Sequence, residues 1–341
     1  MQGRCLRRPI LVSKPHREDA APAVAASWRP NSVALPTKSH KIAVVIPTIG
    51  RYDDLGRMLA SLAAQTRLPD EVIIVDQDET SLRFVGEFPQ LHIQVIALPG
   101  SACLKRNAGF RAAQPDVDLI AFLDDDIVLE PEAVEALLRF WDEAPEDLGG
   151  AGFNLVNHLP VYAGALKRLR LTSRLGLYDS AKGAVLRSGF HTTMPDVQQD
   201  LYVRWLPSWA VVYSRKVLAE YSFDEWFESY SYLEDLDLSY RISKKYRLAI
   251  VAGARFYHYP SKVGRPNLYM FGKKEVLNRL YFVSKHPELS RPLCCLALSI
   301  RAGMSLFLGL VHRDFSYFQR VAGNFAGFLI APFKGLRPVA R

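Results

Sequence analysis

Between residues 41 and 142, short apolar runs alternate with segments of helical periodicity. Runs typical of buried strands lie at 41–47 (KIAVVIP), 71–75 (EVIIV), Leu91–Ala97 and 119–123 (LIAFL). Helices are predicted at Asp53–Ala64, 101–113 and Pro131–Asp142. Because strands joined through helices pair in parallel, the alternation predicts an α/β fold with a mostly parallel sheet flanked by helices.

Carboxylates follow two of these strands. Asp76 comes directly after one, and Asp124, Asp125 and Asp126 follow another. Ligands bind at the carboxyl ends of parallel strands, so we expect one shared site. Three adjacent carboxylates repel one another, and a hard cation such as Mn²⁺ or Mg²⁺ relieves that repulsion. Alternatively, Asp126 caps the following helix and its neighbours are solvated.

A second group of acids lies where a later helix, Leu233–Lys245, is predicted to begin. Glu234 and Asp235 follow an aromatic stretch, and a carboxylate beside an apolar pocket gains the basicity that a general base needs. Asp237 and Arg241 are four positions apart, the spacing of a helical ion pair.

Two further residues are ambiguous when taken alone. His258 follows a strand-like run and is either a packed core residue or a metal ligand. Arg106 lies in a predicted helix and is either solvated or a partner of phosphate oxygens.

Charge divides the chain into three parts. There are 43 Lys and Arg against 35 Asp and Glu, a net charge of +8. Residues 42–261 carry −8, from 22 bases and 30 acids, whereas 1–41 carry +6 and 262–341 carry +10. We predict a mobile basic tail rich in Pro and Ala at 1–40, a central domain at 41–262, and a basic amphipathic helical segment at 263–341.

Several classes of protein are disfavoured. The four cysteines form no CxxC pair, which argues against a disulfide scaffold or zinc ribbon and favours a reducing, cytoplasmic compartment. The apolar run at 10–12 is too short for a secretory signal. Neither GxGxxG nor GxxxxGK[ST] occurs, so a dinucleotide dehydrogenase and a P-loop ATPase are weak interpretations, and no nucleic-acid-binding motif is present.

The ordered set of motifs resembles family 2 inverting glycosyltransferases, which have the GT-A fold. The resemblance rests on VVIPTIGR (44–51), IIVD (73–76), LKRNAGFRAA (104–113), FLDDDIVLEPEAVEAL (122–137), FDEWFESYSYLEDLDLSYR (223–241) and His258. It implies a Rossmann-like GT-A catalytic domain at 41–262 with a C-terminal helical extension. Two departures occur: residues 76–79 read Asp-Gln-Asp-Glu rather than Asp-Asp-Gly-Ser, and Ser208-Trp209 replaces small residues.

The resemblance also implies roles on the donor side of the site. Pro47 and Thr48 would line the nucleotide end, and Asp76 would contact the base or ribose. Arg106 would approach the base or diphosphate. Asp125, inside the D-x-D motif, would contact the donor.

Metal binding and catalysis are assigned in the same way. Asp124 and Asp126 are the outer members of the D-x-D motif and would hold Mn²⁺ or Mg²⁺, with His258 as a third ligand. Asp235 matches the catalytic base, and its neighbour Glu234 would face the acceptor. An acceptor sugar would stack on the indole of the tryptophan at 209, unless that ring belongs to the core.

The implied activity is metal-dependent transfer of a sugar, with inversion, from a nucleotide-diphospho-sugar to an acceptor hydroxyl. We expect a saccharide or lipid-linked acceptor in the synthesis of a cell-surface polysaccharide or glycolipid. The alternatives are a non-catalytic membrane-bound scaffold on a transferase fold and a sugar-phosphate nucleotidyltransferase. The second would have a Gly-rich loop after its first strand, whereas 47–51 contains one glycine.

The C-terminal segment predicts peripheral attachment at the inner face of the cell membrane. Its apolar runs, Leu293–Val311 and Val321–Phe333, are interleaved with basic residues, and an anionic surface attracts such segments. Arg301, in the middle of the first run, argues against a free-standing span. We expect Lys273, Lys274 and Arg279 to contact the lipid surface, or else the helices to pack on the catalytic domain.

Overall fold

The computed structural model describes residues 40–78, 80–157, 173–174, 176–177, 179, 181–194, 196–228, 230–261 and 263–334. These residues belong to one compact unit, Lys38–Arg341. The predicted tail at 1–40, apart from His40, and residues 158–172 lie outside the described residues.

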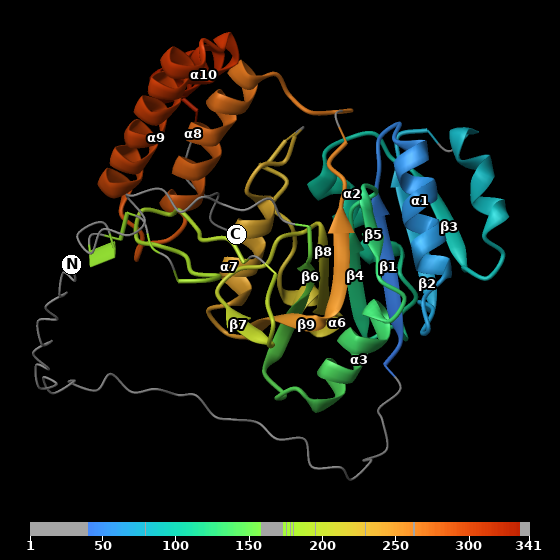
Figure 1. Cartoon of the computed structure of the whole chain (residues 1–341). Helices are drawn as coiled ribbons and strands as arrows, with labels where there is room; N and C mark the ends of the chain where they lie inside the picture. The colour runs from blue at the N-terminus through green and yellow to red at the C-terminus, as the bar shows by residue number, and fades with distance from the viewer. Residues whose placement is uncertain are drawn as a thin grey trace, which may run out of the picture. The chain divides into compact units, whose positions relative to one another are not determined.

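A nine-stranded sheet forms the centre of this unit (Figure 1). Its strands are β1 (Ile42–Pro47), β2 (Glu71–Asp76), β3 (Ile93–Ala97), β4 (Leu119–Leu123), β5 (Ile127–Leu129), β6 (Leu148–Leu155), β7 (Leu201–Val203), β8 (Ala210–Ser214) and β9 (Arg247–His258). They lie in the order β3-β2-β1-β4-β8-β6-β9-β5, with β7 also paired to β9.

The four predicted strands form the parallel half of the sheet. β1 pairs in parallel with β2 and β4, and β2 pairs in parallel with β3. The other half is mixed: β8 runs antiparallel to β4 and β6, β6 is parallel to β9, and β5 and β7 are antiparallel to β9. Periodicity identifies buried strands but not their direction, so this mixed half was not specified by the sequence pattern.

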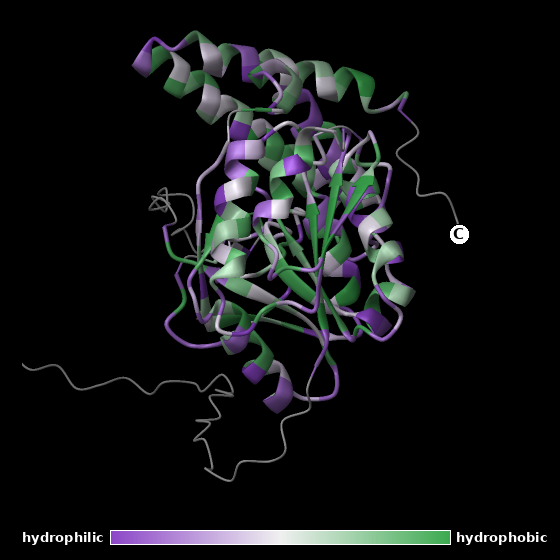
Figure 2. Ribbon diagram, turned by 90° about the vertical axis from the view of Figure 1, so that its right-hand side faces the viewer, coloured by the Kyte–Doolittle hydropathy of each residue, from purple (hydrophilic) through white to green (hydrophobic). Residues whose placement is uncertain are grey.

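Helices cover both faces of the sheet. They are α1 (Tyr52–Ala63), the 3-10 segment η1 (Thr80–Glu87), α2 (Ala102–Ala112), α3 (Ala133–Glu143), α6 (Arg215–Glu220), α7 (Glu234–Ile242), α8 (Leu268–Ser284), α9 (Arg291–His312) and α10 (Phe315–Ile330). Side chains alternate along each strand, so Val44 joins the core under α1 and α3 while Val45 joins the core under α2, α7 and α8. Figure 2 shows the apolar strands between striped helices.

The last three helices stand together beside the sheet, on the side toward which the parallel strands point (Figures 1 and 2). α8 and α10 touch through their backbones. A Cβ added to Gly323 would lie 2.0 Å from the carbonyl oxygen of Tyr269, and one on Gly272 would lie 2.2 Å from that of Arg320. Only glycine permits so close an approach, which fixes α10 to α8.

α8 is not the lipid-facing helix that the sequence predicted. Arg279 is 1% exposed, donates to the carbonyl oxygen of Gly189 at 2.6 Å and lies 4.1 Å from the ring centroid of Phe190. Lys274 donates to the carbonyl oxygen of Glu228 at 2.7 Å. These cations satisfy backbone acceptors inside the protein, so the expectation that they meet a lipid surface is wrong.

Candidate active site

The acidic triplet lies in the turn between β4 and β5, at the carboxyl edge of the sheet. β5 pairs with β9 so that Ile127 is opposite His258, which brings the imidazole Nε2 to 3.1 Å from Oδ1 of Asp126. The other carboxylate oxygen of Asp126 accepts the backbone N–H of Ser261 at 3.0 Å. Asp126 precedes a strand, and the next helix begins at Ala133, so the helix-cap alternative is wrong.

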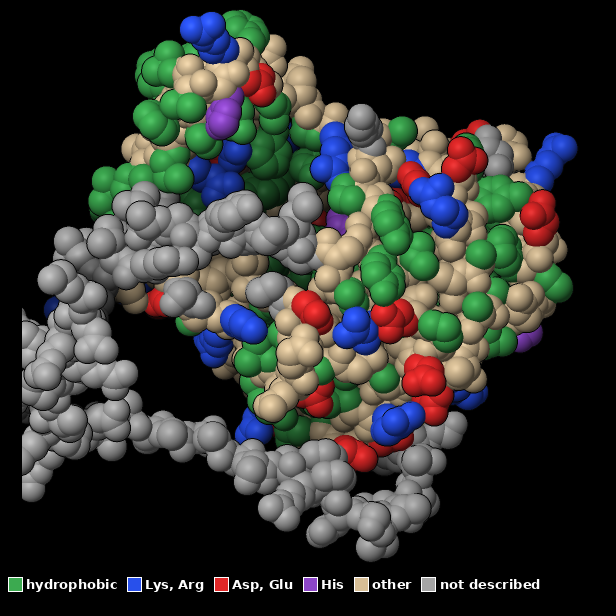
Figure 3. Space-filling model, viewed as in Figure 1, with side chains coloured by type: hydrophobic (Ala, Val, Ile, Leu, Met, Phe, Trp, Pro, Cys, Tyr) green, Lys and Arg blue, Asp and Glu red, His purple; other side chains and the backbone are tan. Residues whose placement is uncertain are grey.

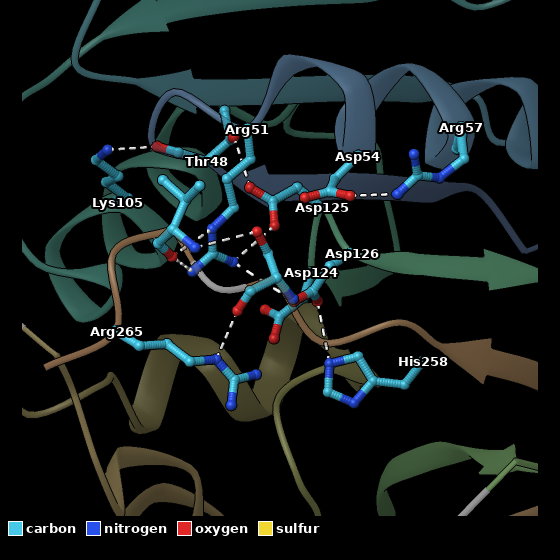
Figure 4. A network of polar contacts seen from close by, with 12 residues as sticks. Thr48, Arg51, Asp54, Arg57, Lys105, Asp124, Asp125, Asp126, His258 and Arg265 are labelled. Atoms are coloured by element: carbon cyan, nitrogen blue, oxygen red, sulfur yellow. Dashed lines mark hydrogen bonds and ion pairs between the residues drawn. The ribbon is translucent and has the colours of Figure 1, made fainter. Parts of the chain in front are cut away.

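Asp125 turns the other way, toward the loop after β1. Its Oδ2 accepts the hydroxyl of Thr48 at 2.6 Å and its Oδ1 accepts Nη1 of Arg51 at 3.0 Å (Figure 4). Burial raises the pKa of Asp125 to about 7, against the opposing effects of Arg51 and Thr48. Both of its oxygens are used inside the protein, and its predicted contact with a donor stays a prediction.

Arg51 ties this loop to the segment after β9. Its Nη2 and Nε donate to the carbonyl oxygen of Val263 at 2.6 and 3.1 Å, and its Nη1 lies 3.5 Å from Oδ2 of Asp126. Burial alone would raise the pKa of Asp126, but the hydrogen bond and charge of His258, the Ser261 N–H and the Arg51 charge together lower it. Asp126 is therefore a stable anion.

Arg106 joins the acidic triplet to the second acidic pair. This α2 side chain is 4% exposed; its Nη2 donates to Oδ1 of Asp124 at 2.7 Å and its Nη1 donates to Oε1 of Glu234 at 3.0 Å. The ring of Phe223 lies 5.3 Å from the guanidinium carbon. Arg106 is thus a buried bridge between the two acidic groups, rather than the solvated side chain of the alternative interpretation.

Glu234 and Asp235 begin α7 after a strained residue. Leu233, buried and not glycine, adopts φ 75° and ψ 11°, a left-handed conformation that β-carbon-bearing residues rarely adopt. Glu234 also accepts the hydroxyl of Ser208 at 3.2 Å, whereas Asp235 accepts the backbone N–H of Leu236 at 2.7 Å. Arg106 therefore neutralises Glu234 directly, and Asp235 is held by backbone N–H groups.

Burial raises the pKa of both members of this pair, and for Glu234 the charge of Asp235 raises it further. The pair is thus more basic than ordinary carboxylates, as a general base requires.

Asp237, one turn along α7, has a different role. It is fully buried and pairs with Arg241 at 3.0 Å and with Lys285 at 2.7 Å. The pair with Arg241 confirms the predicted helical ion pair.

The donor-side residues lie at the ends of β1 and β2. Pro47 ends β1, and Asp76 ends β2 fully buried, accepting the hydroxyl of Tyr52 at 3.0 Å. Lys105, 3% exposed, donates to the carbonyl oxygen of Thr48 at 2.6 Å and lies 4.0 Å from Oδ1 of Asp76. Burial lowers the pKa of Lys105.

Trp209 lies beside the triplet. Its carbonyl oxygen accepts the backbone N–H of Asp124 at 2.8 Å, and its ring centroid lies 5.4 Å from that of His258. The structure therefore brings all the predicted donor, metal and catalytic residues to one edge of the sheet. Their predicted roles are not tested by this placement.

Sequence reasoning missed two cations and two serines in this site: Arg51, Lys105, Ser208 and Ser261. Arg51 and Lys105 lie inside the motifs VVIPTIGR and LKRNAGFRAA, so attention to every base in those motifs would have found them. The serines carry no such signal.

The fit of a divalent cation depends on the ligands that the triplet leaves available. Among the described residues, no group of three or more His, Cys, Asp or Glu side chains is placed so that it could hold a metal ion. Arg51 pairs with Asp125 and Asp126, and Arg106 pairs with Asp124, so repulsion within the triplet alone does not require a metal cation. Asp124 remains 30% exposed, and carboxylate oxygens and an imidazole are ligand types that suit Mn²⁺. Metal binding by Asp124, Asp126 and His258 stays a prediction.

Residues 43–158 match the family model for glycosyl transferase family 2. Two bacterial relatives cover part of this region. YwdF, an uncharacterized glycosyltransferase of Bacillus subtilis (strain 168), is 35% identical over 102 residues, which is 29% of this chain and 37% of the relative. An uncharacterized glycosyltransferase of Haemophilus influenzae is 34% identical over 108 residues, 30% of this chain and 35% of the relative. The chain thus matches little more than a third of these relatives' length.

The solved structures extend the likeness in fold. The mannosyltransferase PcManGT from Pyrobaculum calidifontis, in complex with GDP-Man and Mn²⁺, has a TM-score of 0.51 at 14% identity, over 89% of this chain and 91% of that chain. Residues 1–349 of S. aureus TarS give a TM-score of 0.49 at 17% identity, over 87% and 88%. Residues 43–158 are thus similar to glycosyl transferase family 2, and the likeness to the mannosyltransferase is one of fold, which is of the GT-A type.

Proposed function

We propose that this protein is a metal-dependent inverting glycosyltransferase that moves a sugar from a nucleotide-diphospho-sugar to an acceptor hydroxyl. The observation that carries the proposal is the Arg106 bridge. It holds Asp124 of the D-x-D motif and Glu234 of the Glu-Asp pair in one site, with hydrogen bonds of 2.7 and 3.0 Å. A donor-binding motif and a candidate base thus face the same edge of the sheet, as a direct displacement requires.

The donor would bind across the ends of β1, β2 and β4. Asp76 and Thr48 lie at the nucleotide end, and Arg51 and Lys105 add positive charge near the diphosphate position. Asp124, Asp126 and His258 would hold Mn²⁺ or Mg²⁺, which supplies charge stabilisation to the leaving diphosphate. The mannosyltransferase of similar fold is in complex with GDP-Man and Mn²⁺, which supports testing a nucleotide-sugar and a divalent cation here.

Asp235 would remove the proton from the acceptor hydroxyl. The pKa of this buried carboxyl is raised, and its bonds to backbone N–H groups fix its orientation without a direct neutralising cation. The acceptor oxygen then attacks the anomeric carbon from the face opposite the diphosphate, and the configuration inverts. Trp209 would offer a ring face to the acceptor sugar.

The acceptor is proposed to be a saccharide or a lipid-linked saccharide used for a cell-surface polysaccharide or glycolipid. The proposed location is the cytoplasmic face of the cell membrane, with peripheral attachment to its anionic surface. The basic, apolar C-terminal segment supports that location.

Nucleotide binding tests the site without knowledge of the acceptor. We expect UDP, GDP or dTDP, or one of their sugars, to raise the melting temperature of the wild-type protein with Mn²⁺ or Mg²⁺, and EDTA to abolish the rise. Asp126→Ala should remove the metal-dependent part of the rise, because it deletes a ligand. The matched control is Asp116→Ala, an exposed aspartate before β4 whose side chain is 63% exposed.

The control variant should respond as the wild type does. A stable wild-type protein that shows no shift with any nucleotide would contradict the transferase proposal and favour the scaffold. Exchange of pyrophosphate into a nucleotide sugar, without sugar transfer, would favour the nucleotidyltransferase.

The pH dependence of transfer should reflect the raised pKa of the Glu234–Asp235 pair. The base works only when ionised, so kcat/KM should fall as pH decreases through a value above the ordinary carboxyl range of about 4. The stability of the fold should change with pH in the opposite direction. The folded state binds the protons of Glu234 and Asp235 more tightly than the unfolded state does. The free energy of unfolding should therefore decrease as pH rises through the raised pKa. A profile that stays flat down to pH 4.5 would contradict an Asp235 base.

A further inference from the structure

The α9–α10 hairpin carries an apolar face that the described part of the chain leaves exposed. At least two-fifths of the surface of each of these large side chains is exposed: Leu296, Met304, Leu306, Phe307, Leu310, Val311, Phe315, Phe325, Leu329 and Phe333. At about 3.6 residues per turn, the positions of these residues within each helix fall on one side of that helix. Figure 3 shows apolar side chains gathered over these helices.

The opposite side of α9 explains how the hairpin is held. Cys294, Leu298, Ser305 and Gly309 form the buried stripe that faces the protein. Within the described part of the chain, α9 is the helix that is long and apolar enough to span a membrane. The 18-residue stretch that meets this test has a mean hydropathy of 1.9, and only 28% of it is buried in the protein. The core helix of a globular protein would be mostly buried. The exposed apolar side of α9 is therefore not explained by packing inside this protein.

The charges within the hairpin point toward the protein. Arg301, the residue that argued against a free-standing span, lies 2.7 Å from Oε1 of Glu275 on α8, and Arg320 of α10 lies 2.8 Å from the same oxygen. Glu275 is 1% exposed, and although burial would raise its pKa, the two arginines lower it. One buried carboxylate therefore draws both arginines inward and leaves the outer face apolar.

Basic residues lie at the ends of the hairpin. Arg291 begins α9, Arg313 occupies the turn before α10 and Lys334 follows α10, and all three are exposed. Residues 289–341 contain seven Lys and Arg and a single acid, Asp314. That acid caps α10 by accepting the backbone N–H of Ser316 at 2.9 Å. An apolar face bounded by cations is complementary to a bilayer with anionic headgroups.

We propose that the α9–α10 hairpin lies in the plane of an anionic lipid bilayer, with its outer face inserted among the acyl chains. The packing argues against a span: Arg301 of α9 pairs with Glu275 of α8, and Gly309 of α9 packs against Tyr317 and Phe318 of α10, so α9 is not a separate helix free to cross the bilayer. The 16 residues of α10 are also too few to cross the hydrocarbon core. Lipid is favoured over a second copy of this chain because the outer face is mostly apolar, and few exposed polar groups, Ser299 and Gln319 among them, are available to orient a protein partner.

This inference goes beyond the proposed reaction and does not depend on it, since binding is measured without turnover. The inference also bears on the position of the candidate active site. The parallel strands point toward the layer formed by α8, α9 and α10 (Figures 1 and 2), and α8 is the next element after β9. The carboxyl edge of the sheet would then face the bilayer side, where a lipid-linked acceptor is presented.

Sedimentation with vesicles of phosphatidylcholine and phosphatidylglycerol tests the inference on the full chain. The wild type should bind and stay bound in 0.5 M salt, because insertion is apolar. The triple variant Phe307→Ser, Leu310→Ser, Phe315→Ser should lose at least about a hundredfold in partition coefficient, given the apolar area removed. The control is Tyr202→Ser, which removes a 53% exposed aromatic ring from β7.

Folding of each variant is checked by its melting temperature. A second measurement uses the fluorescence of Phe315→Trp, from which the emission of the wild-type protein is subtracted. The emission of the added tryptophan should shift to the blue when vesicles are present and should be quenched by lipids with brominated acyl chains. The inference fails if the triple variant sediments like the wild type, if the wild type does not bind, or if 0.5 M salt releases it. Loss of a dimer in the triple variant, with no vesicle binding by the wild type, would assign the face to a second copy.

Discussion

Asp235→Asn is expected to lower kcat for sugar transfer by about 10²–10⁴-fold, the usual contribution of a general base. The amide preserves the size of the side chain and can still accept the backbone N–H of Leu236, but it cannot take the acceptor's proton. The nucleotide dissociation constant should change little, because the donor-side residues are untouched. Initial rates with the donor identified by thermal shift measure the first quantity, and titration calorimetry measures the second.

The control for this experiment is Asp116→Asn, which makes the same chemical change at an exposed position outside the site. It should retain the wild-type rate. A rate in Asp235→Asn within threefold of wild type would assign the proton to another group, and Glu234 would be the next candidate. Equal loss of rate and nucleotide affinity would point to a collapsed site rather than a lost base.

Arg106→Met should both destabilise the protein and stop transfer. Methionine fills much of the same volume but leaves Asp124 and Glu234 without their shared cation, and breaking a buried ion pair from one side costs about 3–5 kcal/mol. Denaturant unfolding measures this loss. The pKa of Glu234 should rise further, because Arg106 opposes the effects of burial and Asp235.

A double variant separates the role of charge from that of packing. Arg106→Met combined with Glu234→Gln removes the cation and one of its two anions, so it should recover part of the stability lost by Arg106→Met. If the double variant is no more stable than Arg106→Met, the guanidinium acts through its packing on the ring of Phe223, 5.3 Å away, rather than through its charge.

The strands of the parallel half were predictable because burial on both faces requires long apolar runs. KIAVVIP and LIAFL can hardly form anything else between turn-forming residues. The same runs placed Asp76 and the triplet at the carboxyl edge. Predictions for α8 failed because its basic residues resemble a surface pattern, and the sequence does not reveal that Arg279 meets the carbonyl oxygen of Gly189, 90 positions away.

By itself, the sequence determined the alternation of strands and helices, the strand ends that carry the acids and the apolar, basic character of the last helices. Only the tertiary structure decided which charges meet. Arg106 is 18 residues from Asp124 and 128 from Glu234, and Arg301 turns inward because Glu275 is buried on a different helix. The periodicity of a segment shows which of its faces is apolar. An ion pair instead depends on how elements distant in the sequence pack together. The electrostatics of the site and the uncharged outer face of α9 therefore follow from the fold.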